Sequence, residues 1–203
     1  MDYSFIPEAM DNPCFSSVST VLDVGCGWGA NIRTLKNKYN INTTGLTNSL
    51  QQFDLLKNED IILSDAEDYV PDKEYDLIMF VQSITHMKNS VLKNYQSATN
   101  KIFITDFVSN EYKYQYDWDM RIRTKIEYEY MFNKMGFEIK EFKVWPYEKY
   151  YPNAQYWLDN INKHKITNGH QMIMLKRFCE DILGNMHKLR GVLMCDIYAE
   201  RIK

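Results

Sequence analysis

The stretch Val21-Leu-Asp-Val-Gly-Cys-Gly-Trp-Gly29 decides how this chain folds. The apolar run Thr20–Val24 predicts a buried strand, the three glycines that follow at alternate positions predict a loop, and the next residues have helical spacing. Glycine adopts backbone dihedrals that other residues avoid, and it lets a ligand approach the main chain. The first turn of the helix behind it supplies N–H groups without partners. We therefore predict a ligand cradle at this loop.

Short apolar runs alternate with amphipathic segments over the first half of the chain. Besides Thr20–Val24, the runs predicted as buried strands are residues 42–46, 60–64, 75–81 and 101–107. Between them, Ile32 and Leu35 share one face of a predicted helix, and so do Leu50, Phe53 and Leu56 of the next. The alternation predicts an α/β, doubly wound, parallel sheet with every strand's carboxyl end at one edge. Ligands bind at that edge.

The pattern changes after the fifth strand. Residues 119–135 are predicted as one long helix that ends at Gly136, and Phe137–Val144 as a strand. Residues 191–202 are predicted as the last strand. The aromatic-rich residues 145–190 between these strands are predicted to form two helices.

Length, charge and cysteine content limit the class of protein. A chain of 203 residues fits one domain. We expect a short cap, a cofactor-binding core, a helical substrate cover and a last strand, over residues 1–19, 20–144, 145–190 and 191–203. A formal net charge of −3 without a basic block argues against a nucleic-acid partner.

The four cysteines lack the spacing of a zinc site or a disulfide framework, so we expect no metal. We find neither a signal peptide nor an apolar run near the roughly 20 residues of a membrane span. We therefore expect a cytoplasmic protein without membrane insertion. A homodimer is compatible with the sequence.

The glycine loop also fits the dinucleotide fingerprint, since Gly25, Gly27 and Ala30 satisfy G-x-G-x-x-G/A. Two features argue against that ligand. Asp23 would repel a pyrophosphate, whereas it would attract the ammonium group of a methionine moiety. The next strand ends in Gly45-Leu-Thr-Asn-Ser49, without the acid that binds a dinucleotide's ribose. A turn in which the glycines serve only the backbone is the remaining alternative.

The quoted stretch resembles motif I of class I S-adenosylmethionine-dependent methyltransferases. Together with Gly45-Leu-Thr-Asn-Ser-Leu-Gln-Gln52, it is similar to the branch that contains cyclopropane fatty acid synthases and many small-molecule N- and C-methyltransferases. The resemblance implies a Rossmann-like methyltransferase fold, with a seven-stranded, mostly parallel sheet whose last strand is antiparallel and follows a helical insert. It also implies S-adenosylmethionine as cofactor and S-adenosylhomocysteine as product.

The resemblance extends to further motifs and implies a set of cofactor contacts. In Leu63-Ser-Asp-Ala66, the Asp65 carboxylate would accept from the adenine amine and the Ala66 N–H would donate to the ring. Tyr75-Asp-Leu-Ile-Met-Phe-Val-Gln-Ser83 resembles motif IV, which lies under the methyl donor. Helix capping is the alternative role for Asp65 and Gln82. The predicted cofactor-binding residues are Asp23, Gly25, Cys26, Gly27, Thr47, Asn48, Gln52, Asp65, Ala66, Gln82 and Ser83.

The sequence signals for the methyl acceptor are less specific than those for the cofactor. His86 follows the fourth strand, and imidazole titrates near neutral pH, so His86 is the candidate catalytic base; a capping or packing role is the alternative. Aromatic faces bind amines with about 0.5–2 kcal/mol each. The candidate substrate-binding residues are Tyr3, Tyr116, Trp118, Tyr151 and Tyr156, although aromatic residues at helical spacing can equally pack on the sheet.

We therefore predict methyl transfer to a small soluble metabolite, with nitrogen favoured over oxygen or carbon as the acceptor. A lipid substrate is disfavoured because no amphipathic basic helix is present to dock on a membrane. Three alternatives remain: a cyclase that uses the same cofactor without methylating, an inactive cofactor-binding scaffold, and a methyltransferase that acts on a protein. The intact Asp23, glycine loop and Asp65 argue against the scaffold.

Overall fold

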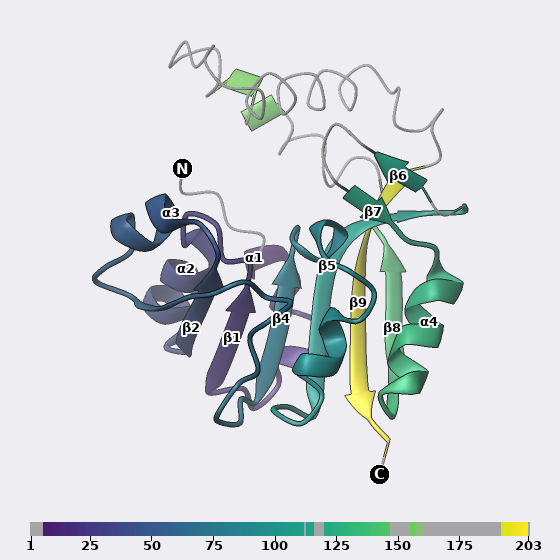
Figure 1. The fold of residues 1–203 in the computed structure, drawn as a ribbon, viewed down its shortest axis with the longest axis horizontal. Helices are drawn as coiled ribbons and strands as arrows, with labels where there is room; N and C mark the ends of the chain where they lie inside the picture. Colours follow the sequence, from purple (N-terminus) through teal and green to yellow (C-terminus); the bar gives the residue numbers. More distant parts are fainter. Residues whose placement is uncertain are drawn as a thin grey trace.

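The computed structural model describes residues 6–111, 113–115, 120–146, 155–156, 158–159 and 192–202. At its centre is a seven-stranded sheet with the order β3-β2-β1-β4-β5-β9-β8 (Figure 1). The strands are β1 (Thr20–Val24), β2 (Asn42–Thr47), β3 (Asp60–Leu63), β4 (Leu77–Val81), β5 (Lys101–Ser109), β8 (Phe137–Val144) and β9 (Val192–Arg201). β9 runs antiparallel to both of its neighbours, and the other pairs are parallel. The predicted fold class is therefore confirmed.

The central strands separate two hydrophobic cores. Successive side chains of a strand point to opposite faces, so Leu22 and Ile78 enter one core while Val21 and Leu77 enter the other. Helix α4 (Lys125–Lys134) and the 3₁₀ helix η3 (Val91–Asn94) cover the first face. The second face is covered by α1 (Ile6–Ala9), α2 (Ala30–Tyr39) and the 3₁₀ helix η1 (Pro13–Phe15). Strands buried on both faces are continuously apolar, which is why their sequences predicted them.

Helices α2 and α3 differ in how well the sequence predicted them. Ile32 and Leu35 are buried under α2, as expected. Helix α3 (Leu50–Leu55) is short and buries no residue, so the predicted apolar face is wrong at Leu50, whereas Phe53 is half-buried and Leu56 is buried. Leu50 is 62% exposed, and Leu56, which caps the end of the helix, packs beside Cys26 and Ile32.

The long helix predicted over residues 119–135 is also wrong in its first part. Met120–Ile122 forms strand β7, which pairs antiparallel with β6 (Lys113–Gln115). Helix α4 begins only at Lys125, because Thr124 caps it: the Thr124 hydroxyl accepts from the Glu127 N–H, and the Glu127 carboxylate accepts from the Thr124 N–H. The predicted end at Gly136 is confirmed, with φ +73° at that residue.

Most of the predicted insert, residues 145–190, lies outside the described residues. Trp145 is a buried member of the second core, and Leu158 is partly buried and packs against this core. None of the described helices has the length and apolarity that crossing a bilayer requires. Within the described ranges, no cluster of three histidine, cysteine or acidic side chains is placed to hold a metal ion.

Candidate functional site

At the carboxyl edge of the sheet, hydrogen bonds join the loop after β1 to the end of β2, and the loop after β4 to the end of β1. The Gly25 and Cys26 N–H groups both donate to the Leu46 carbonyl oxygen, at 2.9 and 3.0 Å. The Ser83 hydroxyl donates to the Val24 carbonyl oxygen at 2.6 Å. Three segments far apart in sequence therefore meet at one place, which is the edge where we expected a ligand.

The glycines of the first loop are required for different structural reasons. Gly25, Gly27 and Gly29 have φ of +77°, +54° and +75°, which side chains rarely tolerate. A Cβ on Gly25 would lie 2.5 Å from the Ser83 Cβ, so the loop after β4 excludes a side chain there. A Cβ on Gly27 would meet nothing within 4 Å. The main chain at Gly27 is thus open to a ligand.

Asp23 is a buried carboxylate at the end of β1. It is fully buried, and among the described residues neither of its oxygens has a hydrogen-bond partner of standard geometry. Burial raises the pKa of the Asp23 carboxyl to about 7, and the nearby Asn31 side chain opposes that rise. An unpaired buried carboxylate is costly, and a positive charge nearby would stabilise its ionised form. The residues present therefore fit a cationic ligand at the glycine loop.

Thr47 and Gln52 form an interlocked corner after β2. The Thr47 hydroxyl donates to the Gln52 Oε1 at 2.6 Å and accepts from the Ser49 N–H at 3.1 Å, while the Ser49 hydroxyl caps α3. The Thr47 side chain is buried and engaged within the corner, whereas Asn48 is exposed. Gln52 is thereby held by its carbonyl oxygen, and its amide nitrogen takes no part in the contact with Thr47.

The predicted adenine corner has a partly structural role. Asp65 is exposed, and its Oδ1 accepts from the Glu67 N–H at 2.8 Å, a bond within a turn and not at the start of a helix. Ala66 is buried, and its carbonyl oxygen accepts from the Tyr95 hydroxyl at 3.0 Å. Cys26 is also buried, within a small cluster with Ile32 and Leu56, and burial raises the pKa of its thiol. Only the main chain of Cys26 therefore faces the candidate site.

The segment after β4 carries the candidate base. Gln82 is exposed and has φ +52°, an uncommon value outside glycine, while its N–H donates to the Thr105 carbonyl oxygen at 2.7 Å. The 3₁₀ helix η2 (Ile84–His86) follows, with an exposed His86 at its end. Ser83, predicted to contact the donor, is buried and uses its hydroxyl to hold β1.

Asp106 of β5 is a buried carboxylate whose contact with the segment after β4 we did not predict. It is fully buried, and its carboxylate accepts from the Thr85 N–H and hydroxyl at 3.2 Å and from the Phe107 N–H at 2.8 Å. Burial raises the pKa of Asp106, opposed by these backbone N–H groups and by the charge of His86. A lone acid inside the apolar run of β5 was the available signal in the sequence.

The predicted substrate-binding aromatic residues are largely not tested. Tyr156 is 39% exposed. The others, Tyr3, Tyr116, Trp118 and Tyr151, lie outside the described residues.

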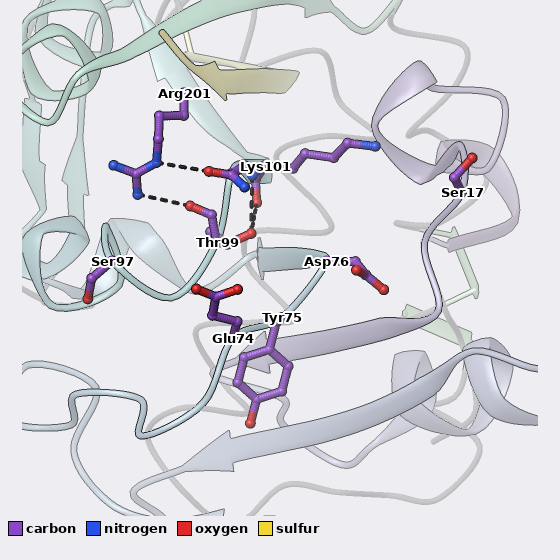
Figure 2. A pocket seen from close by; sticks show the side chains of 9 residues that line it. Ser17, Glu74, Tyr75, Asp76, Ser97, Thr99, Lys101 and Arg201 are labelled. Atoms are coloured by element: carbon purple, nitrogen blue, oxygen red, sulfur yellow. Dashed lines mark hydrogen bonds between the residues drawn. The ribbon is translucent and has the colours of Figure 1, made fainter. Parts of the chain in front are cut away.

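A polar pocket of about 580 Å³ lies at the opposite edge of the sheet, by the amino ends of β4 and β5 (Figure 2). Three of the charged side chains that line it, Asp76, Lys101 and Arg201, are hydrogen-bonded to nearby protein groups. Asp76 accepts from the Ser19 and Thr20 N–H groups at 2.9 Å, and Arg201 donates to the Asn100 Oδ1 and the Thr99 carbonyl oxygen. These contacts join the termini of strands, and they leave the glycine-loop edge as the candidate site.

A family model described as mycolic acid cyclopropane synthetase matches residues 9–128, more than half of the chain. The chain belongs to this family. Membership confirms the resemblance predicted from the glycine loop. The part of the chain that matches the family contains every cofactor-binding residue predicted above, together with His86 and Asp106.

Curated relatives match a shorter part. A probable (S)-tetrahydroprotoberberine N-methyltransferase 2 from Papaver bracteatum is 42% identical over 83 residues, which is 36% of this chain and 23% of that protein. The matched segment therefore spans less than a quarter of that relative.

Solved structures share the fold. Coclaurine N-methyltransferase bound to N-methylheliamine and SAH has a TM-score of 0.78 at 16% identity, covering 96% of this chain and 70% of that one. The [4+2]-cyclase SpnF has a TM-score of 0.76 at 15% identity, covering 97% and 79%. This chain thus shares its fold with solved proteins of differing named activity.

Proposed function

We propose that this chain is an S-adenosylmethionine-dependent methyltransferase that methylates a nitrogen atom of a small molecule. The observation that carries the proposal is Asp23, a fully buried carboxylate whose oxygens have no hydrogen-bond partner of standard geometry among the described residues, beside an open glycine loop. Family membership and the similarity to an alkaloid N-methyltransferase support it. With it we propose a cytoplasmic location and no nucleic-acid partner.

Different residues around the loop would contact different parts of the cofactor. When bound, S-adenosylmethionine supplies a methyl group activated by a sulfonium. Asp23 favours the positive charge of the methionine end, and the main chain at Gly27 lies open beside it. Asn48 and Gln52 follow at the end of β2, where Thr47 holds the Gln52 carbonyl oxygen. Asp65 and Ala66 would receive the adenine, and Gln82 would lie near the reacting centre.

His86 would accept the proton of an amine acceptor. It is exposed at the end of a tight turn, at the same sheet edge as the glycine loop. Because the sulfonium already activates the methyl group, the remaining work of the protein is to place the acceptor and remove its proton. The aromatic residues predicted to bind substrate, in and before residues 145–190, would cover this edge.

Calorimetric titration with S-adenosylmethionine and S-adenosylhomocysteine, with NAD as the control, tests the cofactor. We expect both adenosyl compounds to bind and NAD not to bind. Binding of NAD alone, or of none of the three, would refute the proposal. Asp23→Asn should weaken binding of both S-adenosylmethionine and S-adenosylhomocysteine, because both carry the ammonium group that Asp23 would attract.

Product analysis tests the reaction. Incubation with S-adenosylmethionine and a panel of amines, phenols and carbon nucleophiles should add one CH₂ in mass to an amine and release S-adenosylhomocysteine. A cyclised product, or methylthioadenosine without methyl uptake, would instead support a non-methylating enzyme. Binding without turnover on any acceptor would favour a scaffold.

A further inference from the structure

Arg123 is fully buried, and its guanidinium donates hydrogen bonds to the segment that carries His86. Its Nη1 donates to the Ile84 carbonyl oxygen at 2.8 Å and its Nη2 to the Met87 carbonyl oxygen at 2.5 Å. Its Nε donates to the Asn89 Oδ1 at 2.7 Å. The acceptors lie on both sides of His86 in the chain, so one guanidinium spans the turn that ends at this histidine.

The main chain of Arg123 is fixed to β5. Its carbonyl oxygen accepts from the Ser109 N–H at 3.1 Å, and Arg123 bridges to Val108 in parallel register. Arg123 therefore joins the end of β5 to the segment after β4. Planar guanidinium groups suit this role, because their donors are arranged in a rigid fork.

Asp106 holds the same turn from β5 through Thr85. The two buried charges lie near a common group, Tyr128: its pKa is raised by burial first and then by Asp106, and is lowered by Arg123. The guanidinium carbon is 5.9 Å from the centre of the Tyr128 ring. Buried charges are costly unless they are paired or hydrogen-bonded. Two buried polar side chains from neighbouring elements, Asp106 and Arg123, therefore hold the turn that ends at His86.

We propose that Arg123 is a positioning residue that sets the place of the His86 imidazole at the reaction edge. The inference rests on the proposed function for its catalytic consequence, and on geometry alone for the placement of His86. Arg123 touches neither cofactor nor acceptor in this scheme. It acts through the main chain on either side of His86, with Asp106 as the opposing contact.

The variants are Arg123→Gln, Arg123→Lys and Asn89→Ala, with Arg201→Gln as the matched control. The Arg201 guanidinium likewise donates to a carbonyl oxygen and to an asparagine side chain, but at the opposite sheet edge (Figure 2). Asn89 is exposed, and its loss removes one acceptor without leaving a cavity, so it serves if Arg123→Gln does not fold.

The first readout is steady-state kinetics on an amine acceptor. We expect Arg123→Gln to lower kcat by about 100-fold, as misplacement of a catalytic group does, with little change in the Kd of S-adenosylmethionine. Arg123→Lys should recover part of kcat, and Asn89→Ala should lose less. Arg201→Gln should stay within about twofold. In a His86→Ala background, Arg123→Gln should cost nothing further; an equal loss in both backgrounds would overturn the proposal.

The second readout does not depend on catalysis. In the cofactor-free protein, the ring ¹H–¹³C resonances of the four histidines can be assigned with His86→Ala. Arg123→Gln, or Asn89→Ala in its place, should shift or broaden the His86 signal and spare the other three, while Arg201→Gln should leave all four. An unmoved His86 signal would overturn the inference. If the wild-type protein methylates nothing, the proposed function fails, and this spectrum still decides whether Arg123 positions His86.

Discussion

The Ser83 hydroxyl donates to the Val24 carbonyl oxygen at 2.6 Å and so holds the loop after β4 against the end of β1. The same contact brings the Ser83 Cβ to 2.5 Å from the position of a Cβ on Gly25. One hydrogen bond thus explains why the first glycine of the loop cannot be replaced, and it separates the roles of the three glycines.

Gly25→Ala and Gly27→Ala should therefore differ. Both incur the cost of a positive φ, about 1–3 kcal/mol, but only Gly25→Ala also collides with Ser83. We expect thermal unfolding to show the larger loss for Gly25→Ala. Gly27→Ala should instead mainly weaken S-adenosylmethionine binding, because its Cβ would enter the space left to the ligand. Equal losses of stability would contradict this distinction.

Without cofactor, the stability of Asp23→Asn relative to the wild type should increase as pH rises. The unfolded carboxyl ionises near 3.8, whereas burial keeps the folded one protonated until about 7. Folding therefore takes up a proton between these values, and the contribution of Asp23 to stability falls as pH increases through them, by at most about 1.4 kcal/mol per pH unit.

The measurement is the difference in unfolding free energy between the wild type and Asp23→Asn from pH 4 to pH 8. The difference should grow in favour of Asn up to about pH 7 and then level off. Other titrating groups, including Asp106, cancel in it. A flat difference would mean that Asp23 is not desolvated. S-adenosylmethionine should reverse the order of stability, because its charge stabilises the ionised carboxylate.

Thr47→Val should release Gln52 without altering the shape of β2. The variant loses the bond to Gln52 and the bond from the Ser49 N–H, which together correspond to about 1–2 kcal/mol. We expect S-adenosylmethionine binding to weaken by about tenfold. Thr43→Val is the control, since Thr43 is a buried threonine of the same strand that bonds only to the Ile41 carbonyl oxygen in the described contacts. Comparable weakening by both variants would point to the strand as a whole.

His86→Ala should lower kcat by about 100-fold or more, as loss of a general base does, and leave cofactor affinity unchanged. Added imidazole should restore part of the turnover of His86→Ala and none of that of an Asp23→Asn variant. Unchanged turnover in His86→Ala would remove it as the base.

The strands and the glycine loop could be predicted because local sequence determines them. Fully buried strands such as β4 are continuous apolar runs, and a glycine loop after a strand has few alternatives. The start of α4 was missed although Thr124-Lys-Ile-Glu127 carries the capping-box pattern. The alternation of Met120 and Ile122 in β7 spans too few residues to be distinguished from a helix.

Arg123 and Ser83 could not be predicted in their roles for a different reason. Arginine is seldom fully buried, and the partners of Arg123 are carbonyl oxygens more than thirty residues earlier in the chain, which no local pattern reveals. Ser83 was correctly placed at the sheet edge, but whether its hydroxyl faces a ligand or Val24 depends on the packing of two loops. Long-range contacts made by single side chains are invisible to periodicity.

The order β5-β9-β8 has a consequence for synthesis of the chain. Residues 110–191 separate β5 from the strand that covers its edge, so a nascent chain exposes that edge until β9 has been made. Ribosomes add roughly 5–20 residues per second, which leaves the apolar edge of β5 open for about 4–20 seconds. An unpaired apolar strand recruits other chains, so in the cell this interval is where chaperones would determine the yield of folded protein.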